Sequence, residues 1–274
     1  MEYFEFILDG ERLHIGMGKY MYTSVEGLND GTITRQSNQY ANMDGVEYTE
    51  SLYEPRLVTI NGYIRGANDE EILKLRQKMM NILNGKKQGN LVYHTGSHEY
   101  FSPAMPDLPV FGERVQNILP FALYFNLPKF YWYDAKTVNE DVLRVTPALI
   151  FPVTFPTEFS SVVNRKIVVN SGQTDADMIV TITGVNDISD MITITNHTSG
   201  AYLQIDHDMI RGEVITIDTA NYSIVSSEDG NILHKIVAGD FFKLVCGAND
   251  IEVSGVYGGD VTVTVTFNRP YVGV

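Results

Sequence analysis

The chain has 274 residues, a length that suits two domains, and its 44% hydrophobic and 20% charged residues are typical of a globular protein. A net charge of −14 at pH 7 disfavours binding to nucleic acid or to anionic lipid, which are both polyanions. No stretch approaches the roughly 18 apolar residues of a membrane-spanning helix, and the acidic start does not resemble a signal peptide. The single cysteine, Cys246, excludes an internal disulfide and cysteine zinc sites. We therefore expect synthesis and assembly in the cytoplasm.

The negative charge is concentrated in the second half of the chain. Residues 1–137 contain 13 Lys and Arg against 17 Asp and Glu, a net −4, whereas residues 138–274 contain 7 against 17, a net −10. The simpler interpretation is solubility, and the alternative is an acidic face that meets a basic protein partner.

Short strands are predicted at the start of the chain. Residues 3–8 and 19–26 read as strands, and the polar stretch 29–42 follows them without a predicted element. Residues 57–65 then alternate strictly, which predicts one strand face with the residues Val58, Ile60 and Ile64.

After this strand, the spacing of apolar residues changes to that of a helix, which is predicted over residues 69–84. Five apolar residues recur at spacings of three and four, the pattern of one helical face: Ile72, Leu75, Met79, Ile82 and Leu83. Asn68 or Asp69 can cap the N-terminus, and Gly85 suits the left-handed turn that ends a helix. We expect the five apolar residues to be mostly buried.

A hairpin, a loop and a closing strand complete the first predicted domain. The hairpin spans residues 90–101 with Thr95 and Gly96 as its turn, and residues 102–113, with three prolines, predict a loop that makes protein contacts. Residues 116–127 predict the closing strand. The polar stretch 134–142 then marks the boundary between domains of residues 1–137 and 138–274.

The second domain reads as a β-sandwich or barrel. Strands are predicted at 213–218, 241–245 and 260–267, separated by turns at 247–250 and 258–260. In the last strand the apolar and threonine residues alternate, which places one set toward a core and the other toward solvent: Val261, Val263, Val265 and Phe267 against Thr262, Thr264 and Thr266.

Two polar clusters could suggest chemistry, but neither predicts an active site. His94, His98 and Glu99 lie on the predicted hairpin. They are better explained as residues of a surface hairpin than as a metal site, because a metal needs three or four convergent ligands. In Asp206-His207-Asp208, adjacent strand residues point to opposite faces and cannot converge on one substrate atom.

The remaining candidates do not change this outcome. We expect the histidines of both clusters to be exposed or bonded to backbone, and Cys246 to be a small buried hydrophobe. The sequence therefore predicts no catalytic, cofactor or metal site, and a protein that is not an enzyme.

Carbohydrate binding is the alternative function, because β-sandwiches often bind sugars on an aromatic side chain. The single tryptophan, Trp132, lies in the first domain. The second domain offers only tyrosines for such stacking: Tyr202, Tyr222, Tyr257 and Tyr271.

The order of these elements resembles the distal tail protein of bacteriophages with long non-contractile tails. The segments that carry the resemblance in the first domain are Asp44-Gly45, the arginine-led strand after Glu54-Pro55, and the exit 118–125 followed by Pro128 and Tyr131-Trp132. In the second domain they are residues 211–218, Phe242-Lys243-Leu244, the stretch 247–251 and Arg269-Pro270-Tyr271. Val245-Cys246 departs from the proline expected before the glycine.

The resemblance implies a mainly β fold, with a barrel-like first domain carrying one helix and a galectin-like β-sandwich after it. It also implies a structural role in the virion, at the tip of a phage or prophage tail. There, six copies form a ring that connects the tail tube protein to the tail-tip and receptor-binding proteins. The first domain would make this ring, and the second would project as a docking platform.

Overall fold

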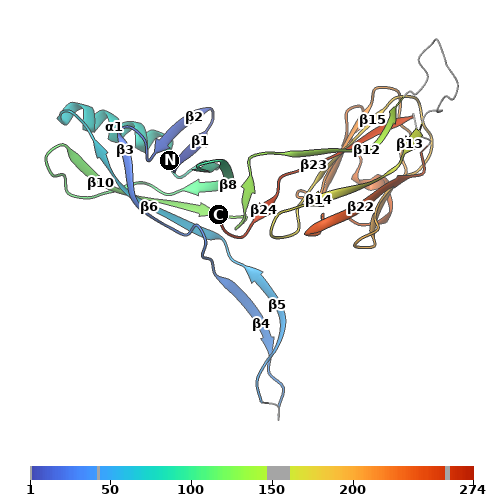
Figure 1. Ribbon diagram of the computed structural model, residues 1–274, viewed down its shortest axis with the longest axis horizontal. Helices are drawn as coiled ribbons and strands as arrows, with labels where there is room; N and C mark the ends of the chain where they lie inside the picture. Colours follow the sequence, from blue (N-terminus) through green and yellow to red (C-terminus); the bar gives the residue numbers. More distant parts are fainter. Residues whose placement is uncertain (1, 42–43, 147–160, 257–259) are drawn as a thin grey trace. The chain divides into compact units, whose positions relative to one another are not determined.

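The computed structural model describes residues 2–41, 44–146, 161–256 and 260–274. Within these ranges the chain is mainly β, with one α-helix and the short 3-10 helix η1 (Leu233–Lys235), which confirms the expected fold class (Figure 1). The chain forms two compact units. The first comprises Met1–Ala135 and Tyr271–Val274, and the second comprises Lys136–Pro270. No helix of the described residues is long and apolar enough to cross a membrane.

The first unit is built on an antiparallel sheet with the strands β1 (Tyr3–Leu8), β2 (Glu11–Ile15), β3 (Tyr20–Glu26), β6 (Arg56–Arg65), β7 (Gly89–Thr95), β8 (His98–Pro106), β9 (Val110–Phe111), β10 (Ile118–Leu127) and β11 (Trp132–Asp134). Their order is β2-β1-β7-β8-β10-β6-β3, with β9 paired to β10 and β11 paired to β8. After the second unit, β24 (Pro270–Tyr271) returns the chain to the first.

The predicted strand at 57–65 corresponds to β6, and its alternation is confirmed. Val58, Ile60 and Ile64 are fully buried in the core of the first unit. Their neighbours in this core come from every long strand of the sheet and include Phe4, Phe6, Leu91, Leu123, Phe125 and Trp132.

Helix α1 (Asp69–Ile82) begins as predicted and ends slightly earlier. The side chain of Asn68 accepts a hydrogen bond from the backbone N–H of Glu71 (2.9 Å), which caps the first turn. Four of the five expected apolar residues are buried, but Leu75 is only half-buried. Gly85 adopts the left-handed conformation (φ 75°) beyond the last turn.

The polar stretch 29–42, where no element was predicted, contains a strand. β4 (Ile33–Asn38) pairs with β5 (Glu47–Tyr53) in a separate two-stranded hairpin that projects from the first unit (Figure 1). Every residue of both strands is exposed. A strand that buries neither face has no reason to alternate, so its sequence lacks the pattern by which strands are recognised.

Two further local predictions for the first unit are wrong. The turn between β7 and β8 lies one residue later than predicted, because Thr95 pairs with His98 and leaves Gly96 (φ 54°) and Ser97 as the loop. The predicted loop at 102–113 begins inside β8. Pro103 lies between the part of β8 that pairs with β11 and the part that pairs with β10, where a missing N–H disturbs pairing least.

The second unit consists of two antiparallel sheets. The larger, in the order β13-β12-β23-β15-β18-β19-β20, contains β12 (Val138–Thr146), β13 (Ser161–Val163), β15 (Ile179–Gly184), β18 (Val214–Asp218), β19 (Ser223–Ser226), β20 (Gly230–Asn231) and β23 (Val261–Phe267). The smaller, in the order β14-β22-β16-β17-β21, contains β14 (Arg165–Asn170), β16 (Ile192–Asn196), β17 (Ala201–Ile205), β21 (Ile236–Gly239) and β22 (Gly247–Ser254).

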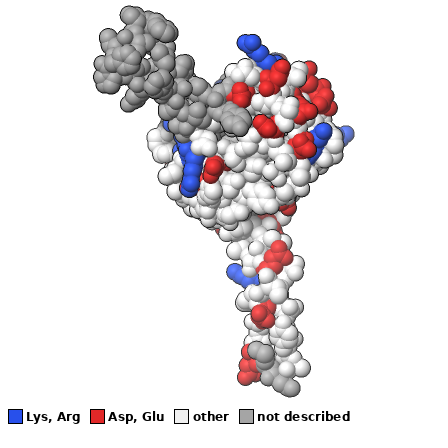
Figure 2. All heavy atoms as spheres, turned by 90° about the vertical axis from the view of Figure 1, so that its right-hand side faces the viewer, with Lys and Arg blue, Asp and Glu red and all other residues white. Residues whose placement is uncertain are grey.

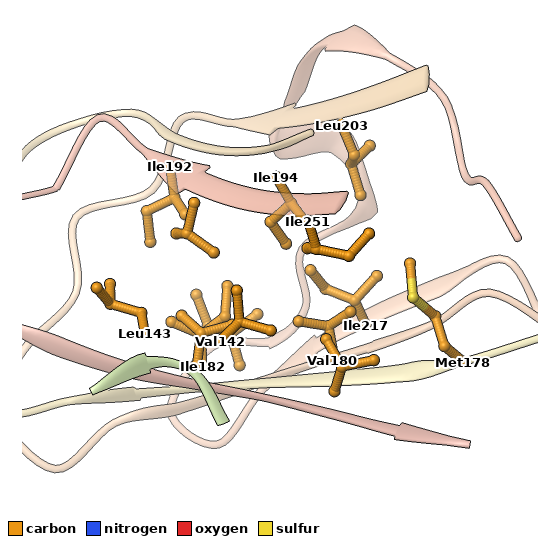
Figure 3. Packing of buried hydrophobic residues seen from close by; sticks show 14 of the residues in the cluster. Val142, Leu143, Met178, Val180, Ile182, Ile192, Ile194, Leu203, Ile217 and Ile251 are labelled. Carbon is orange, nitrogen blue, oxygen red and sulfur yellow. The ribbon is translucent and has the colours of Figure 1, made fainter. Parts of the chain in front are cut away.

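Apolar side chains from the two sheets meet in one core, the packing expected of a sandwich. Figure 3 shows Val180, Ile182 and Ile217 of the larger sheet facing Ile194 and Ile251 of the smaller one. The alternation predicted for residues 260–267 is confirmed, since the three valines and the phenylalanine are buried and the threonines are not.

One strand of the second unit was predicted in the wrong place. Residues 241–245 form no strand apart from a single bridge at Leu244, whereas the predicted turn 247–250 is the start of β22. Asn249 accounts for the error. Its buried side chain bonds the N–H and C=O of Val245, so a residue typical of turns is satisfied inside a strand.

We expect the replacement Met79→Ala to destabilise the first unit. Met79 is fully buried against the sheet, and such a truncation costs about 2–5 kcal/mol through lost contacts and a cavity. The single tryptophan, Trp132, lies in the same core, so denaturation followed by its fluorescence reports this unit.

The matched control is Leu73→Ala on the same helix, where the side chain is 52% exposed. Its effect should stay within about 0.5 kcal/mol. Equal losses in the two variants would contradict the packing of α1 described above.

Candidate functional site

A buried arginine organises the root of the β4–β5 hairpin. Arg56 opens β6 on the core side of the strand and is 2% exposed. Its guanidinium donates to the carbonyl oxygens of Gly27 (3.4 Å), Leu28 and Val272. Burial lowers the pKa of Arg56 below its ordinary value, and the nearby Asp30 and Tyr53 offset only part of this effect. The guanidinium remains charged at neutral pH.

An aromatic ring lies against this guanidinium. The ring centre of Phe130 is 4.1 Å from the Cζ of Arg56, and the ring stacks on Tyr53 at 4.3 Å. Phe130 has a left-handed backbone (φ 58°), which is strained for a bulky residue and persists only where the surroundings hold it. A Cβ at Gly31 would lie 2.2 Å from the Phe130 ring, so this approach requires glycine.

The hairpin that leaves this root exposes several large apolar side chains. Tyr48 is 61% exposed, and Ile33, Leu52 and Tyr53 are exposed as well. Tyr40 and Val46, nearer the tip, are also exposed. A separate two-stranded hairpin is at best marginally stable in water, and exposed apolar patches mark contact surfaces.

The first sequence-predicted cluster is divided by the β7–β8 register. His94 pairs directly with Glu99, and its Nδ1 lies 3.7 Å from the Glu99 carboxylate. His98 is exposed, and its Nδ1 lies 2.9 Å from the hydroxyl oxygen of Ser97. His94 itself is half-buried and stacks on Tyr3 at 4.1 Å, so the expectation of an exposed or backbone-bonded histidine is wrong here.

The residues that sequence reasoning missed near this cluster lie on β1 and β2. Glu5 is buried, with His14 Nδ1 at 2.9 Å, Arg12 at 3.4 Å and His94 Nε2 at 3.8 Å from its carboxylate oxygens. Only strand pairing brings these residues together. Among the described residues, no group of three His, Cys, Asp or Glu side chains is arranged to hold a metal ion.

In the second cluster, residues 206–208 follow β17 (Ala201–Ile205) and are not in a strand, although strand residues were expected there. Asp206 and Asp208 are exposed, but His207 is buried, so the expectation of an exposed or backbone-bonded histidine is wrong. Its Nε2 lies 2.7 Å from the Glu213 carboxylate, which also accepts from the Ser226 hydroxyl (2.5 Å) and the Ile210 N–H (3.1 Å). Glu213 is separated from His207 by a turn that the sequence does not reveal.

Burial of Glu213 acts to raise the pKa of its carboxyl. The hydrogen bonds from Ser226, His207 and the Ile210 N–H outweigh that effect, so the pKa is lowered below its ordinary value of 4.5. The cluster joins the segment after β17 to the end of β19 and has the character of a structural clamp.

Two other expectations concern Cys246 and the aromatic residues. Cys246 is exposed rather than buried, and its thiol donates to the carbonyl oxygen of Gly172 (3.1 Å). Trp132 is fully buried, so it offers no sugar platform. Tyr202 and Tyr222 are exposed, Tyr271 belongs to the first unit, and Tyr257 lies outside the described residues.

Comparison with known families decides what kind of protein carries these features. The family described as "Phage tail protein RIFT-related domain" matches residues 16–126, and the family described as "Siphovirus-type tail component, C-terminal domain" matches residues 171–271. The chain belongs to the siphophage distal tail family. The resemblance noted in the sequence is thereby confirmed, and the protein is a component of the phage tail.

Solved structures share the fold of this distal tail family member. The crystal structure of the Dit protein of phage SPP1, described as a paradigm of hub adsorption apparatus, has a TM-score of 0.73 and 13% identity, covering 98% of this chain and 99% of the other. The baseplate of phage p2, in its activated conformation with Ca or with Sr, contains a chain with a TM-score of 0.56 and 11% identity over 100% of both chains. No curated protein sequence matches the chain.

We expect the Glu213 clamp to make the second unit of this distal tail family member sensitive to acid. Because the folded-state pKa of Glu213 is lowered, its contribution to stability is present above the ordinary value of 4.5 and is lost as the pH falls through the folded value. Glu213→Gln should therefore be less stable than wild type at pH 7, with the difference shrinking below about pH 4.5.

Calorimetric unfolding across this pH range measures the difference, with Glu228→Gln as control because Glu228 is exposed. A gap between wild type and Glu213→Gln that stays constant with pH would contradict the clamp.

Proposed function

We propose that this tail component forms a closed homo-oligomeric ring of six copies, which joins the tail tube to the tail-tip and receptor-binding proteins. The first unit makes the ring, and the second, galectin-like unit presents a docking surface. The protein acts as a scaffold and not as an enzyme. The observation that carries the proposal is the exposed β4–β5 hairpin.

The hairpin supports self-association because it lacks what stabilises a strand pair in isolation. It buries neither face, and its apolar side chains are in water. The six residues of β4, at about 3.3 Å each, give the strand a length of roughly 20 Å, so the hairpin is long enough to lie across a neighbouring molecule. A neighbour that covers Tyr48 and Leu52 would supply the missing burial.

Such a contact also favours a closed ring. The hairpin of one copy meets a different surface on the next, which is a head-to-tail contact, and contacts of this type close into rings when the rotation per copy permits. The likeness in fold to a hub protein and to baseplate chains agrees with this form of assembly.

Charge supports the role of the second unit as a platform for a basic partner. Residues 138–274 carry 17 acidic against 7 basic side chains. Figure 2 shows Asp and Glu outnumbering Lys and Arg on the face of this unit that is turned to the viewer. Because every copy is negative, charge repulsion opposes ring formation. Moderate salt screens this repulsion and should strengthen the assembly.

We expect wild-type protein to form oligomers whose mass in light scattering increases with concentration and with moderate salt. The double replacement Tyr48→Ser and Leu52→Ser should shift the protein to monomer. At a dilution where wild type is also monomeric, the unfolding followed by Trp132 fluorescence should be the same in both, because both side chains are exposed in the single chain.

The matched control is Tyr222→Ser in the second unit, where the tyrosine is 61% exposed, as Tyr48 is. This variant should assemble as wild type does. A wild-type protein that remains a monomer at every concentration and salt, with or without other tail proteins, would contradict the ring.

A further inference from the structure

Both strands of the β4–β5 hairpin leave the first unit at one aromatic ring. On the β5 side, the ring of Phe130 stacks on Tyr53 with 17° between the planes. On the β4 side, Gly31 lies against the same ring at a distance that excludes a Cβ. The direction of the hairpin therefore depends on where Phe130 is held.

The position of Phe130 depends in turn on Arg56. The guanidinium packs against the Phe130 ring and donates to the carbonyl oxygens of Gly27 and Leu28, which lie in the turn that leads into β4. The same group donates to the carbonyl oxygen of Val272. One buried cation thus connects the hairpin root to a segment more than 200 residues later in the sequence.

That segment, residues 271–274, is a strap across the first unit. The ring of Tyr271 meets Tyr100 edge to face at 5.3 Å, and Val274 packs against the core. Gly273 lies so close to Asn29 that a Cβ at this glycine would be 2.7 Å from the Asn29 Oδ1 and 3.3 Å from its Cα. The strap therefore lies directly on the turn that enters β4.

We propose that the strap of residues 271–274 locks the hairpin root through Arg56 and fixes the direction in which the hairpin is presented to a second copy. The last step rests on the ring proposed above, whereas the locking itself concerns the single chain. If the strap leaves, the guanidinium loses the Val272 carbonyl, and a buried cation with fewer acceptors turns toward water. Phe130 then loses the contact that holds its left-handed backbone, and the root loosens.

Two variants test the lock from opposite sides. Gly273→Val puts a branched side chain on the strap with its Cβ 3.3 Å from the Asn29 Cα, so it crowds the strap against the turn, and its backbone is outside the left-handed region, so strain at the position itself is avoided. Arg56→Lys keeps the charge but not the planar fork that reaches several carbonyls. Arg65→Lys, exposed at the other end of β6, is the matched control.

The readout is the distance between spin labels on Ser37→Cys in the hairpin and Lys78→Cys on α1, both exposed sites, in a Cys246→Ser background. Excess unlabelled protein removes distances between copies. Wild type and Arg65→Lys should give one narrow distribution, and Gly273→Val and Arg56→Lys should give broad ones while Trp132 fluorescence shows an intact core.

Narrow distributions in both Gly273→Val and Arg56→Lys would overturn the lock. Failure of the lock can be told apart from failure of the proposed ring, because the distance is measured within one chain. A wild-type protein that never assembles would contradict the proposed function and leave the distance comparison fully interpretable. Broad distributions in both variants, together with loss of oligomer mass, would support the inference and the ring together.

Discussion

The buried guanidinium of Arg56 is the interaction on which the projecting parts of the first unit depend. Removing such a charge from water costs several kcal/mol unless hydrogen bonds and partners compensate. Here three carbonyl oxygens and the Phe130 ring surround it, and they come from three segments of the unit: the turn that leads into β4, the residues before β11 and the strap of residues 271–274. The positive φ of Phe130 and the missing side chain at Gly31 follow from the same packing.

This arrangement joins segments that are far apart in the chain. The turn before β4, the start of β6, the residues before β11 and the C-terminal strap meet at one place. The remainder of the first unit is an ordinary antiparallel sheet with one helix packed on its core. The feature that distinguishes it is an exposed hairpin with a buried, charged root, which suits a part that must be held in a fixed direction to meet a partner.

The sequence predicts those parts of the fold in which one face is buried. β6 and β23 alternate because one face of each meets a core, and α1 shows both its apolar stripe and its Asn68 cap. The β4–β5 hairpin escapes prediction because both its faces are in water. The start of β22 escapes because Asn249, a residue typical of turns, has its side-chain hydrogen bonds satisfied inside a strand. The partners of His207 and of Arg56 could not be found, because contacts such as His207–Glu213 and Arg56–Val272 depend on the turns and tertiary packing that join them. The family resemblance rested on the order of elements, which tolerates these local errors.

The central claim, a ring whose neighbours are joined by the hairpin, is tested most directly by an electron cryo-microscopy map of the assembled wild-type protein. The account predicts a closed ring in which β4 and β5 lie on the first unit of the adjacent copy and cover Tyr48 and Leu52. A ring joined through other surfaces, with the hairpin free in solvent, would contradict it.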